Sequence, residues 1–220
     1  MNSTLNILAL DTATPETCAC LYTGGELFTA SLGANQRIRS TGITPMLSNL
    51  LQQGGLDWSA LQLLAFSHGP GSFTGLRIGA ATLAGINSAI HLPILHLSSL
   101  ALTATQAGPS HQPLWVLEDA RAGEAFVCCY QNGNPITEPR CMSWQQLEDE
   151  RNGGHYCCQS EPPIKLATWQ RLALQIKRPV ALAMQLKQCS VTAEQFNALP
   201  IYPTPNYMQL SQAERNAHAT

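Results

Sequence analysis

The sequence has few charged residues and no concentration of basic ones. Of its 220 residues, 12 are Lys or Arg and 14 are Asp or Glu, which gives a formal net charge of -2. Proteins that bind nucleic-acid duplexes carry basic patches that release counterions from the phosphates. The composition therefore argues against direct nucleic-acid binding by this chain alone. Sparse charge on a chain that is 45% apolar also indicates surface that a protein partner covers.

Long apolar runs and a basic leader segment are also lacking. No stretch approaches the roughly 20 apolar residues that a membrane-spanning helix needs, and residues 1–16 fit a first strand better than a secretory signal. The 8 cysteines include two vicinal pairs but no CxxC spacing. We therefore expect free thiols, no metal site, no membrane association and a cytoplasmic location.

The pattern of apolar residues predicts an α/β architecture. We expect strands at residues 5–10, 18–23, 27–32, 61–67 and 93–97, and helices at 43–53 and 74–90, with Pro45 in the first turn of the former. A short helix starts at Ser98 or Ser99, and residues 106–113 form a linker. Two strands then flank a turn at 119–123, residues 135–165 are irregular, helices follow at 169–177 and 180–187, and the tail from 199 is extended. We predict a first lobe at residues 1–106 and a smaller second one at 107–220.

A glycine-rich loop, "HGPGSFTGLRIG" at residues 68–79, connects a predicted strand to a predicted helix. It lacks the lysine and the spacing of a Walker A loop, and Thr74 stands where a dinucleotide-binding fingerprint needs its third glycine. Ser72 or Thr74 can cap the helix, and the glycines permit positive φ or close backbone approach. From the residues alone, a tight capped turn and an anion or partner site stay equally open.

The helix after this loop has no polar face. Between residues 75 and 90 the only charge is Arg77, and a helix of this kind is buried on both sides. Helix 43–53 also has an apolar face that must be buried. We therefore predict that both helices contact a second protein. The alternative is that the C-terminal segments of this chain cover them. The predicted contact residues are Met46, Leu47, Leu50, Leu76, Gly79, Ala80, Leu83 and Asn87. Arg77 lies in the first turn, where a cation opposes the helix dipole, so we expect Asp11 to pair with it.

Three motifs resemble those of the TsaB (YeaZ) family: "ILALDTAT" at residues 7–14, "GPGSFTGLRIG" at 69–79 and "EDARAGEAF" at 118–126. The resemblance covers the first 130 residues in order, and the tail more weakly through "LPIY" at 199–202. It implies an actin-like (ASKHA) fold of two ribonuclease-H-like lobes, with mixed sheets flanked by helices and a reduced second lobe. The motif residues are Asp11, Thr12 and Thr14 of a vestigial phosphate loop; Gly69, Pro70, Gly71, Ser72, Phe73, Thr74, Gly75 and Arg77; and Asp119, Arg121 and Gly123 in the second lobe.

The resemblance also implies a non-catalytic role. Members of this family pair with TsaD, which forms threonylcarbamoyladenosine on adenosine 37 of tRNAs that read codons beginning with adenine, and the ATPase TsaE joins that pair. The implied protein scaffolds and activates TsaD, meets tRNA only through the complex, and forms a homodimer in isolation. It has no cofactor of its own, while an ATP or ADP site at the shared interface stays open.

The alternative is an actin-fold phosphotransferase or ATPase that uses Asp11 and the glycine loop. Ala13 stands where such enzymes have a glycine in their phosphate hairpin, and the six histidines show no HxxxH or HExxH spacing. We therefore expect no catalytic residues and no metal ligands. The sequence departs from the family pattern before Pro45 and at Pro203 and Thr204.

Overall fold

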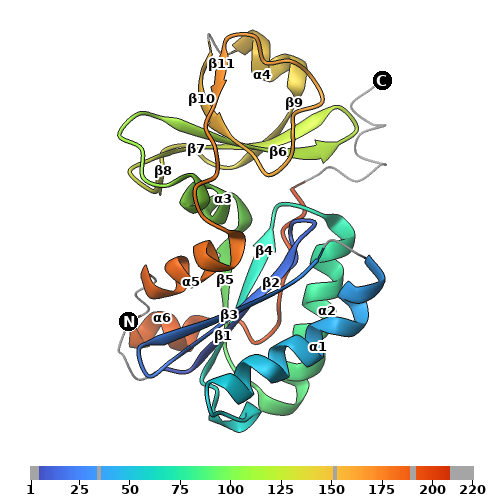
Figure 1. Cartoon of the computed structure of the whole chain (residues 1–220), viewed down its shortest axis with the longest axis vertical. Coiled ribbons are helices and arrows are strands. Elements are labelled where there is room, and N and C mark those ends of the chain that lie inside the picture. Colours follow the sequence, from blue (N-terminus) through green and yellow to red (C-terminus); the bar gives the residue numbers. More distant parts are fainter. Residues whose placement is uncertain (1–4, 34–35, 151–152, 189–191, 209–220) are drawn as a thin grey trace.

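The chain forms two sheets, one above the other in Figure 1, with helices packed around each. The computed structural model describes residues 5–33, 36–150, 153–188 and 192–208. The first sheet has the order β3-β2-β1-β4-β5. Its strands are β1 (Ile7–Asp11), β2 (Thr17–Thr23), β3 (Glu26–Leu32), β4 (Leu63–Gly69) and β5 (Ile94–Ser98). The first three are antiparallel, and β4 and β5 run parallel to β1.

Alternating side chains of the first sheet build two cores, one on each face. Leu8 and Leu10 of β1 face a core shared with α1 (Gln36–Gln53) and α2 (Phe73–Ile90). Ile7 and Ala9 face the opposite core, which includes side chains of α3 (Ser99–Ala107) and α5 (Arg178–Gln188). Because successive strand residues point to opposite faces and both faces are covered, β1 is apolar from Ile7 to Leu10, and all five of its residues, Asp11 included, are buried.

The second lobe is built on a sheet of order β11-β10-β6-β7-β8, with β9 also paired to β7. The long antiparallel pair β6 (Leu114–Arg121) and β7 (Glu124–Gln131) forms its centre. The remaining elements are β8 (Asn134–Pro135), β9 (Arg140–Ser143), α4 (Trp144–Glu150), β10 (Gly154–Cys157) and β11 (Trp169–Arg171). This lobe is smaller than the first, and α3 packs beneath its sheet (Figure 1).

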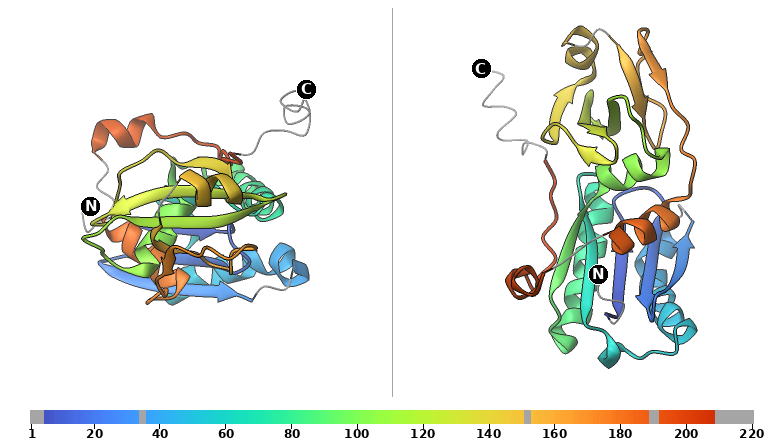
Figure 2. Two further views of the ribbon diagram at one scale, coloured as in Figure 1. Left: turned by 90° about the horizontal axis from the view of Figure 1, so that it is seen from above. Right: turned by 90° about the vertical axis from the view of Figure 1, so that its left-hand side faces the viewer.

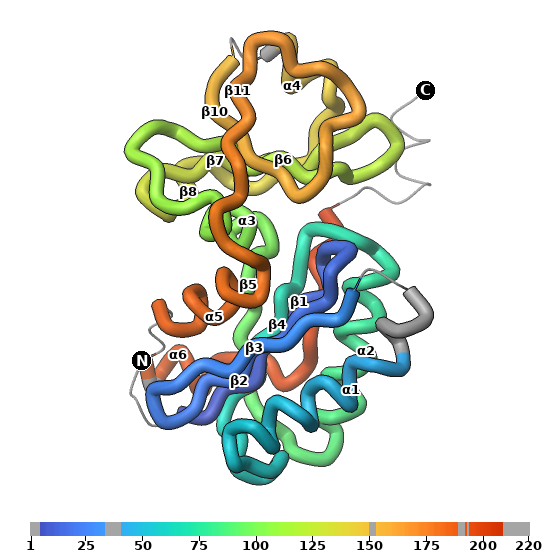
Figure 3. The backbone as a smooth tube through the Cα atoms, viewed as in Figure 1, coloured from blue at the N-terminus to red at the C-terminus, as the bar shows by residue number. Residues whose placement is uncertain are grey.

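The chain crosses between the lobes twice and returns to the first lobe. Residues 108–113 lead from α3 to β6, and residues 172–177 lead back from β11 to α5, as the tube in Figure 3 shows. Leu182 and Leu186 of α5 then pack in the core beneath the first sheet. The expected division at 106/107 therefore misses the return, because the segment from Arg178 onward packs on the first lobe.

The tail forms a strap along the first lobe. After α6 (Ala193–Ala198), residues 199–208 run beside the β5 edge toward the second lobe (Figure 2, right). The Ile94 N–H donates to the carbonyl of Pro200 (2.7 Å), and the Asn206 N–H donates to the carbonyl of His68 (2.7 Å). The expected extended tail is thus found as far as residue 208, and residues 209–220 lie outside the described part.

The α/β fold of two mixed sheets flanked by helices, with a reduced second lobe, is confirmed. Helix α1 begins earlier than expected, so Pro45 lies in its interior and not in its first turn. The predicted helix at 169–177 is wrong, because residues 169–171 pair with β10 as a strand. Residues 135–165 also contain regular elements, β9, α4 and β10.

Two glycines of α2 provide a matched test of how closely this helix packs on the sheet. A Cβ at Gly79 would lie 2.2 Å from Thr12 Oγ1 and 3.0 Å from the Phe66 ring, whereas a Cβ at Gly85 would meet nothing within 4 Å. We expect Gly79→Ala to lower the free energy of unfolding by about 1–3 kcal/mol through overpacking. Gly85→Ala should raise it by about 0.5–1 kcal/mol through helix propensity. Urea unfolding measures both, and equal effects would contradict this packing.

Candidate functional site

The three sequence motifs converge on one cleft between the lobes. The cleft has a volume of about 560 Å³ and is lined by the turn after β1, the glycine loop, the end of β6, the segment after β10 and Arg178. Its motif residues are Thr14, Pro70, Gly71, Ser72, Phe73, Thr74, Asp119 and Arg121. Motifs far apart in the sequence therefore share one site.

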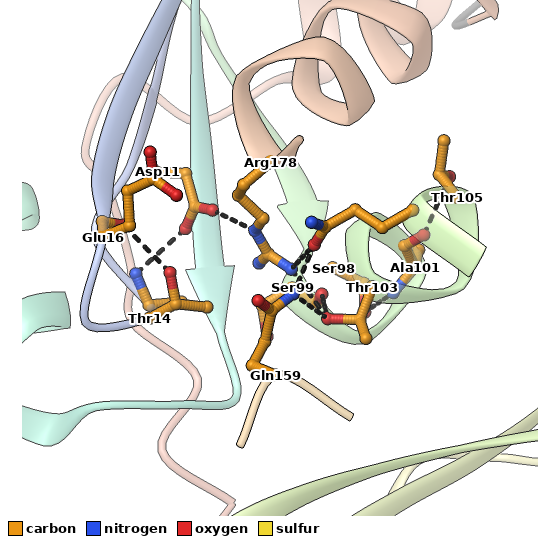
Figure 4. Close-up of polar contacts among 12 residues, drawn as sticks. Asp11, Thr14, Glu16, Ser98, Ser99, Ala101, Thr103, Thr105, Gln159 and Arg178 are labelled. Atoms are coloured by element: carbon orange, nitrogen blue, oxygen red, sulfur yellow. Dashed lines mark hydrogen bonds and ion pairs between the residues drawn. The ribbon is translucent and has the colours of Figure 1, made fainter. Parts of the chain in front are cut away.

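A buried ion pair lies at the base of the cleft. Nε of Arg178, at the start of α5, donates to Oδ2 of Asp11 at 2.6 Å, and the other carboxylate oxygen of Asp11 accepts from the Ala13 N–H at 2.9 Å (Figure 4). The side chains of Arg178 and Asp11 are 1% and 0% exposed. Both oxygens of Asp11 are thus engaged within the chain, and its charge is balanced internally.

The predicted pairing of Arg77 with Asp11 is wrong. Arg77 is exposed and lies over the ring of Phe73, with its guanidinium carbon 5.4 Å from the ring centroid. Asp11 is enclosed behind the glycine loop and bound by Arg178, so no cation on the outside of α2 can reach it. Arg178 is the residue that sequence reasoning missed. Its signal is an arginine directly before a proline at the start of a helix, followed by the apolar run from Val180 to Met184.

Arg178 also connects to a polar network that joins the lobes. Its Nη1 donates to Thr103 Oγ1 at 2.7 Å and to Gln106 Oε1 at 3.3 Å, both on α3. Thr103 Oγ1 in turn donates to Glu118 Oε1 of β6 at 2.8 Å. It also accepts from Gln159 Nε2 at 3.3 Å (Figure 4). The network thus runs from β1 and α5 of the first lobe, through α3, to the second lobe.

Glu118 is the carboxyl group of this network whose pKa is strongly raised. Burial raises the pKa of its carboxyl to about 7, although Arg178 and the hydrogen bond from Thr103 act in the opposite direction. The charge of Arg178 is already balanced by Asp11, which leaves Glu118 without a cation of its own. Its protonation state therefore changes near neutral pH.

The glycine loop is filled by contacts within the chain. A Cβ at Gly71 would lie 2.4 Å from the carbonyl oxygen of Ala13, and the Ser72 N–H donates to that oxygen at 2.8 Å. Gly69 has φ +116°, and a Cβ there would lie 2.4 Å from the carbonyl oxygen of Asn206 in the strap. Ser72 caps α2 by accepting from the Gly75 N–H. Of the two readings left open by the sequence, these contacts support the tight capped turn.

The remaining motif residues shape turns around the cleft. Thr12 and Thr14 are buried, and Thr14 Oγ1 donates to the carbonyl of Glu16. Asp119 accepts from the Arg121 N–H at 2.9 Å and forms an ion pair of 3.2 Å with its guanidinium. Gly123 follows at φ +82° and ends the turn between β6 and β7, as predicted.

Most of the residues predicted to contact a partner lie inside this chain. The set is Met46, Leu47, Leu50, Leu76, Gly79, Leu83 and Asn87, and all seven are buried. Only Ala80 is partly exposed. The five apolar side chains of this set fill the core between α1, α2 and the sheet, because the apolar stripe of each helix faces its own lobe. Any contact surface on these helices must therefore use their outer faces.

Asn87 has a structural role within the chain. Its Nδ2 donates to the carbonyls of Leu92 (2.8 Å) and Ile201 (2.6 Å), and its Oδ1 accepts from the Leu92 N–H (2.8 Å). These bonds close the C-terminal end of α2 and attach the strap to it.

None of the seven cysteines that the structure describes is in a disulfide, and six of them are buried. Burial raises the pKa of Cys20 to about 12 and that of Cys158 to about 11, so these thiols stay protonated and pack as small apolar groups. Within the described ranges there is no cluster of three or more His, Cys, Asp or Glu side chains arranged to hold a metal ion. Nor does any helix there have the length and apolar character to cross a membrane.

Comparisons with known proteins agree with the motifs. The sequence model of the family described as "TsaD: tRNA N6-adenosine threonylcarbamoyltransferase" matches residues 35–147. The tRNA threonylcarbamoyladenosine biosynthesis protein TsaB of Haemophilus influenzae is 39% identical over 56% of this chain and 52% of its own length. TsaB of Escherichia coli is 34% identical over 58% of this chain and 55% of its own length. The chain thus spans about half the length of these curated relatives.

Solved structures extend the likeness to the whole fold. YeaZ from Pseudomonas aeruginosa superposes with a TM-score of 0.65 over 90% of this chain and all of that chain, at 24% identity. A second Pseudomonas aeruginosa structure, described as similar to peptidase YEAZ, gives a TM-score of 0.68 over 94% of this chain and all of that chain, at 23% identity. These likenesses concern the fold.

The buried ion pair provides the test of this site. Arg178→Met should lower the free energy of unfolding by about 3–5 kcal/mol, because it leaves Asp11 buried and unpaired. The double variant Asp11→Leu with Arg178→Met should recover most of that loss, since neither member of the pair is then left buried without its partner. Denaturant unfolding of Arg178→Met, Asp11→Leu and the double variant measures these losses. A double variant that loses as much as the sum of the single ones would contradict a coupled pair.

Proposed function

The chain belongs to the family that the TsaD sequence model describes, in its TsaB (YeaZ) group, and from this we propose that it is a non-catalytic subunit in threonylcarbamoyladenosine biosynthesis on tRNA. In this proposal it docks on a TsaD-like threonylcarbamoyltransferase in the cytoplasm and supports the activity of that enzyme. The ATPase TsaE joins the pair, and tRNA is contacted through the assembly. The names of the sequence relatives support the pathway, and the geometry of the cleft supports the non-catalytic role.

The observation that carries the non-catalytic role is the engagement of Asp11 by Arg178. A carboxylate that binds a metal–nucleotide complex or activates a nucleophile needs a free oxygen that faces the substrate. Here one oxygen of Asp11 accepts from Arg178 and the other from Ala13, with the side chain fully buried. The contact of Gly71 with Ala13 also fills the space where a phosphate would approach the turn. Both contacts count against the ATPase or phosphotransferase alternative.

The outer face of α2 has the character of a docking surface. Its exposed residues are mostly small, with Thr74, Ala81, Gly85 and Ser88 along the helix and Arg77 as the exposed charge. Gly79 is required by its contact with Thr12, but the space around Gly85 is open. A glycine inside a helix costs about 1 kcal/mol relative to alanine. A close approach by the backbone of another protein would account for the glycine at position 85.

The part of the neighbouring helix whose side chains are described, residues 41–53 of α1, continues this surface without adding charge. The exposed residues of α1 whose side chains are described are Thr41, Thr44, Pro45, Asn49, Gln52 and Gln53. A surface with so little charge costs little to desolvate, so two helices of a partner can pack on α1 and α2. When the partner is absent, the same face can pair two copies of this chain. In this proposal any ATP or ADP binds at the shared interface and not to this chain alone.

Substitutions on the outer face of α2 test the docking. Gly85→Arg and Ala81→Arg should abolish co-purification with a TsaD-like protein, because each places a long charged side chain where a partner helix would approach. Gly85→Ala, which adds only a methyl group at this close approach, should weaken the complex without abolishing it. Met184→Arg, at an exposed position of α5 away from this face, serves as the control and should keep the complex.

The same variants connect docking to function. In cells that depend on this chain for TsaB activity, Gly85→Arg should reduce threonylcarbamoyladenosine in tRNA, measured by mass spectrometry of digested nucleosides, and Met184→Arg should not. A folded Gly85→Arg variant that still binds TsaD would contradict the proposed docking surface. A variant that no longer binds TsaD but keeps the modified nucleoside in tRNA would contradict the proposed function.

A further inference from the structure

The two helices of the proposed docking surface contain basic residues and no acidic ones. Helices α1 and α2 lie side by side on one face of the first sheet (Figure 1). Arg77 is the one charged residue in the sequence of α2, and the sequence of α1 has Arg37 and Arg39. Acidic residues nevertheless outnumber basic ones in the chain as a whole. The charge of these two helices is therefore opposite in sign to that of the whole chain.

Arg77 has no carboxylate partner in the part of the chain that the structure describes. None of the ion pairs there involves its guanidinium. Its side chain is exposed, and the four-residue spacing places it on one stripe of α2 with the exposed residues Phe73, Ala81 and Gly85. This stripe thus has one cation, with no anion of the described chain paired to it.

The guanidinium of Arg77 is already oriented. Its carbon lies 5.4 Å from the centroid of the Phe73 ring. That ring packs in turn against Tyr207 of the strap, with the two centroids 4.8 Å apart. A planar guanidinium that is held in place loses less entropy when it binds a carboxylate through two parallel hydrogen bonds. Phe73 is 53% exposed, so the pair of Phe73 and Arg77 presents an aromatic ring and a cation together. Aromatic and arginine side chains of this kind often dominate the binding energy of an interface.

Docking would take Arg77 out of water. A cation that is buried at an interface without a carboxylate loses its hydration and gains no ion pair in return. A second copy of this chain, docked through the same surface, cannot supply that carboxylate, because neither α1 nor α2 contains Asp or Glu. A symmetric pair brings the same surface of both copies together, so it would bring cations together. The surface therefore matches a different protein better than it matches itself.

We propose that the docking surface selects its partner by charge, with Arg77 paired to a carboxylate on the TsaD-like protein. The same cation disfavours self-association of this chain. This inference rests on the proposed function, because it concerns the same surface and the same partner. Ala81 and Gly85 determine how closely a partner helix approaches, and Phe73 and Arg77 determine which partner is accepted. The homodimer is then the weaker of the two assemblies.

The salt dependence of the two assemblies tests this selection. Salt screens the attraction between unlike charges and also the repulsion between like charges. In calorimetric titrations of the purified TsaD-like protein, the affinity of the unchanged chain should fall about tenfold between about 0.05 and about 0.5 M NaCl. In sedimentation equilibrium of the chain alone, self-association should become stronger over the same range.

Arg77→Met separates the charge from the packing, since methionine keeps an apolar stem beside Phe73. This variant should bind the TsaD-like protein about tenfold more weakly and with less dependence on salt. It should also self-associate more strongly than the unchanged chain, because the repulsion is removed. Lys187→Glu is the control, because Lys187 is exposed on α5, which packs on the opposite face of the first sheet. Lys187→Glu should leave both assemblies as they are in the unchanged chain.

Two results would overturn the selection by charge while leaving the docking surface in place. One is an Arg77→Met variant that binds the TsaD-like protein with the affinity and salt dependence of the unchanged chain. The other is an Arg77→Met variant in which both assemblies weaken together, because this is the result for a residue that only packs. Absence of binding by the unchanged chain at every salt concentration would contradict the proposed function, and this selection with it.

Discussion

The ion pair between Asp11 and Arg178 is the constraint on which the rest of the structure depends. It joins the end of the first strand to a helix 167 residues later, with an Nε–Oδ2 distance of 2.6 Å and almost no exposure of either side chain. A buried charge pair of this kind is costly to break from one side. It therefore requires the chain to return from the second lobe and place α5 under the first sheet. It also uses the carboxylate that an enzyme of this fold would need.

The glycine loop shows how a motif that resembles a phosphate loop can serve packing alone. Gly69 admits the strap, Gly71 admits the turn at Ala13, and Gly79 admits Thr12, each at a distance that a side chain would not allow. Only a glycine fits where a Cβ would lie within 2.4 Å of another backbone atom. The same residues that identify the family thus position β1, α2 and the tail against one another. The cleft retains the outline of a ligand site while its base is filled from within.

Local sequence signals predicted much of the fold, and long-range contacts decided the rest. The apolar strands, the capped helix after Ser72 and the turn at Gly123 follow from nearby residues, and the structure confirms them. The partner of Asp11 could not be found this way, because Arg178 competes with the nearer Arg77 only once the chain has folded. The buried state of Leu76 and Leu83 was likewise open, since an apolar stripe looks the same whether its own sheet or another protein covers it. The strand at Trp169 depends on its pairing with β10 and carries no local signal that separates it from a helix.

A calorimetric titration of the isolated chain with Mg-ATP is the most direct test of the claim that Asp11 is engaged within the chain. Because Arg178 and Ala13 engage Asp11, and Gly71 fills the turn beside it, the account predicts no Mg-dependent binding to the unchanged protein and no effect of Asp11→Ala on that result. Tight Mg-dependent ATP binding by the unchanged chain that disappears in a folded Asp11→Ala variant would contradict it. That result would make Asp11 a nucleotide-site residue and the chain an enzyme of the actin-like fold.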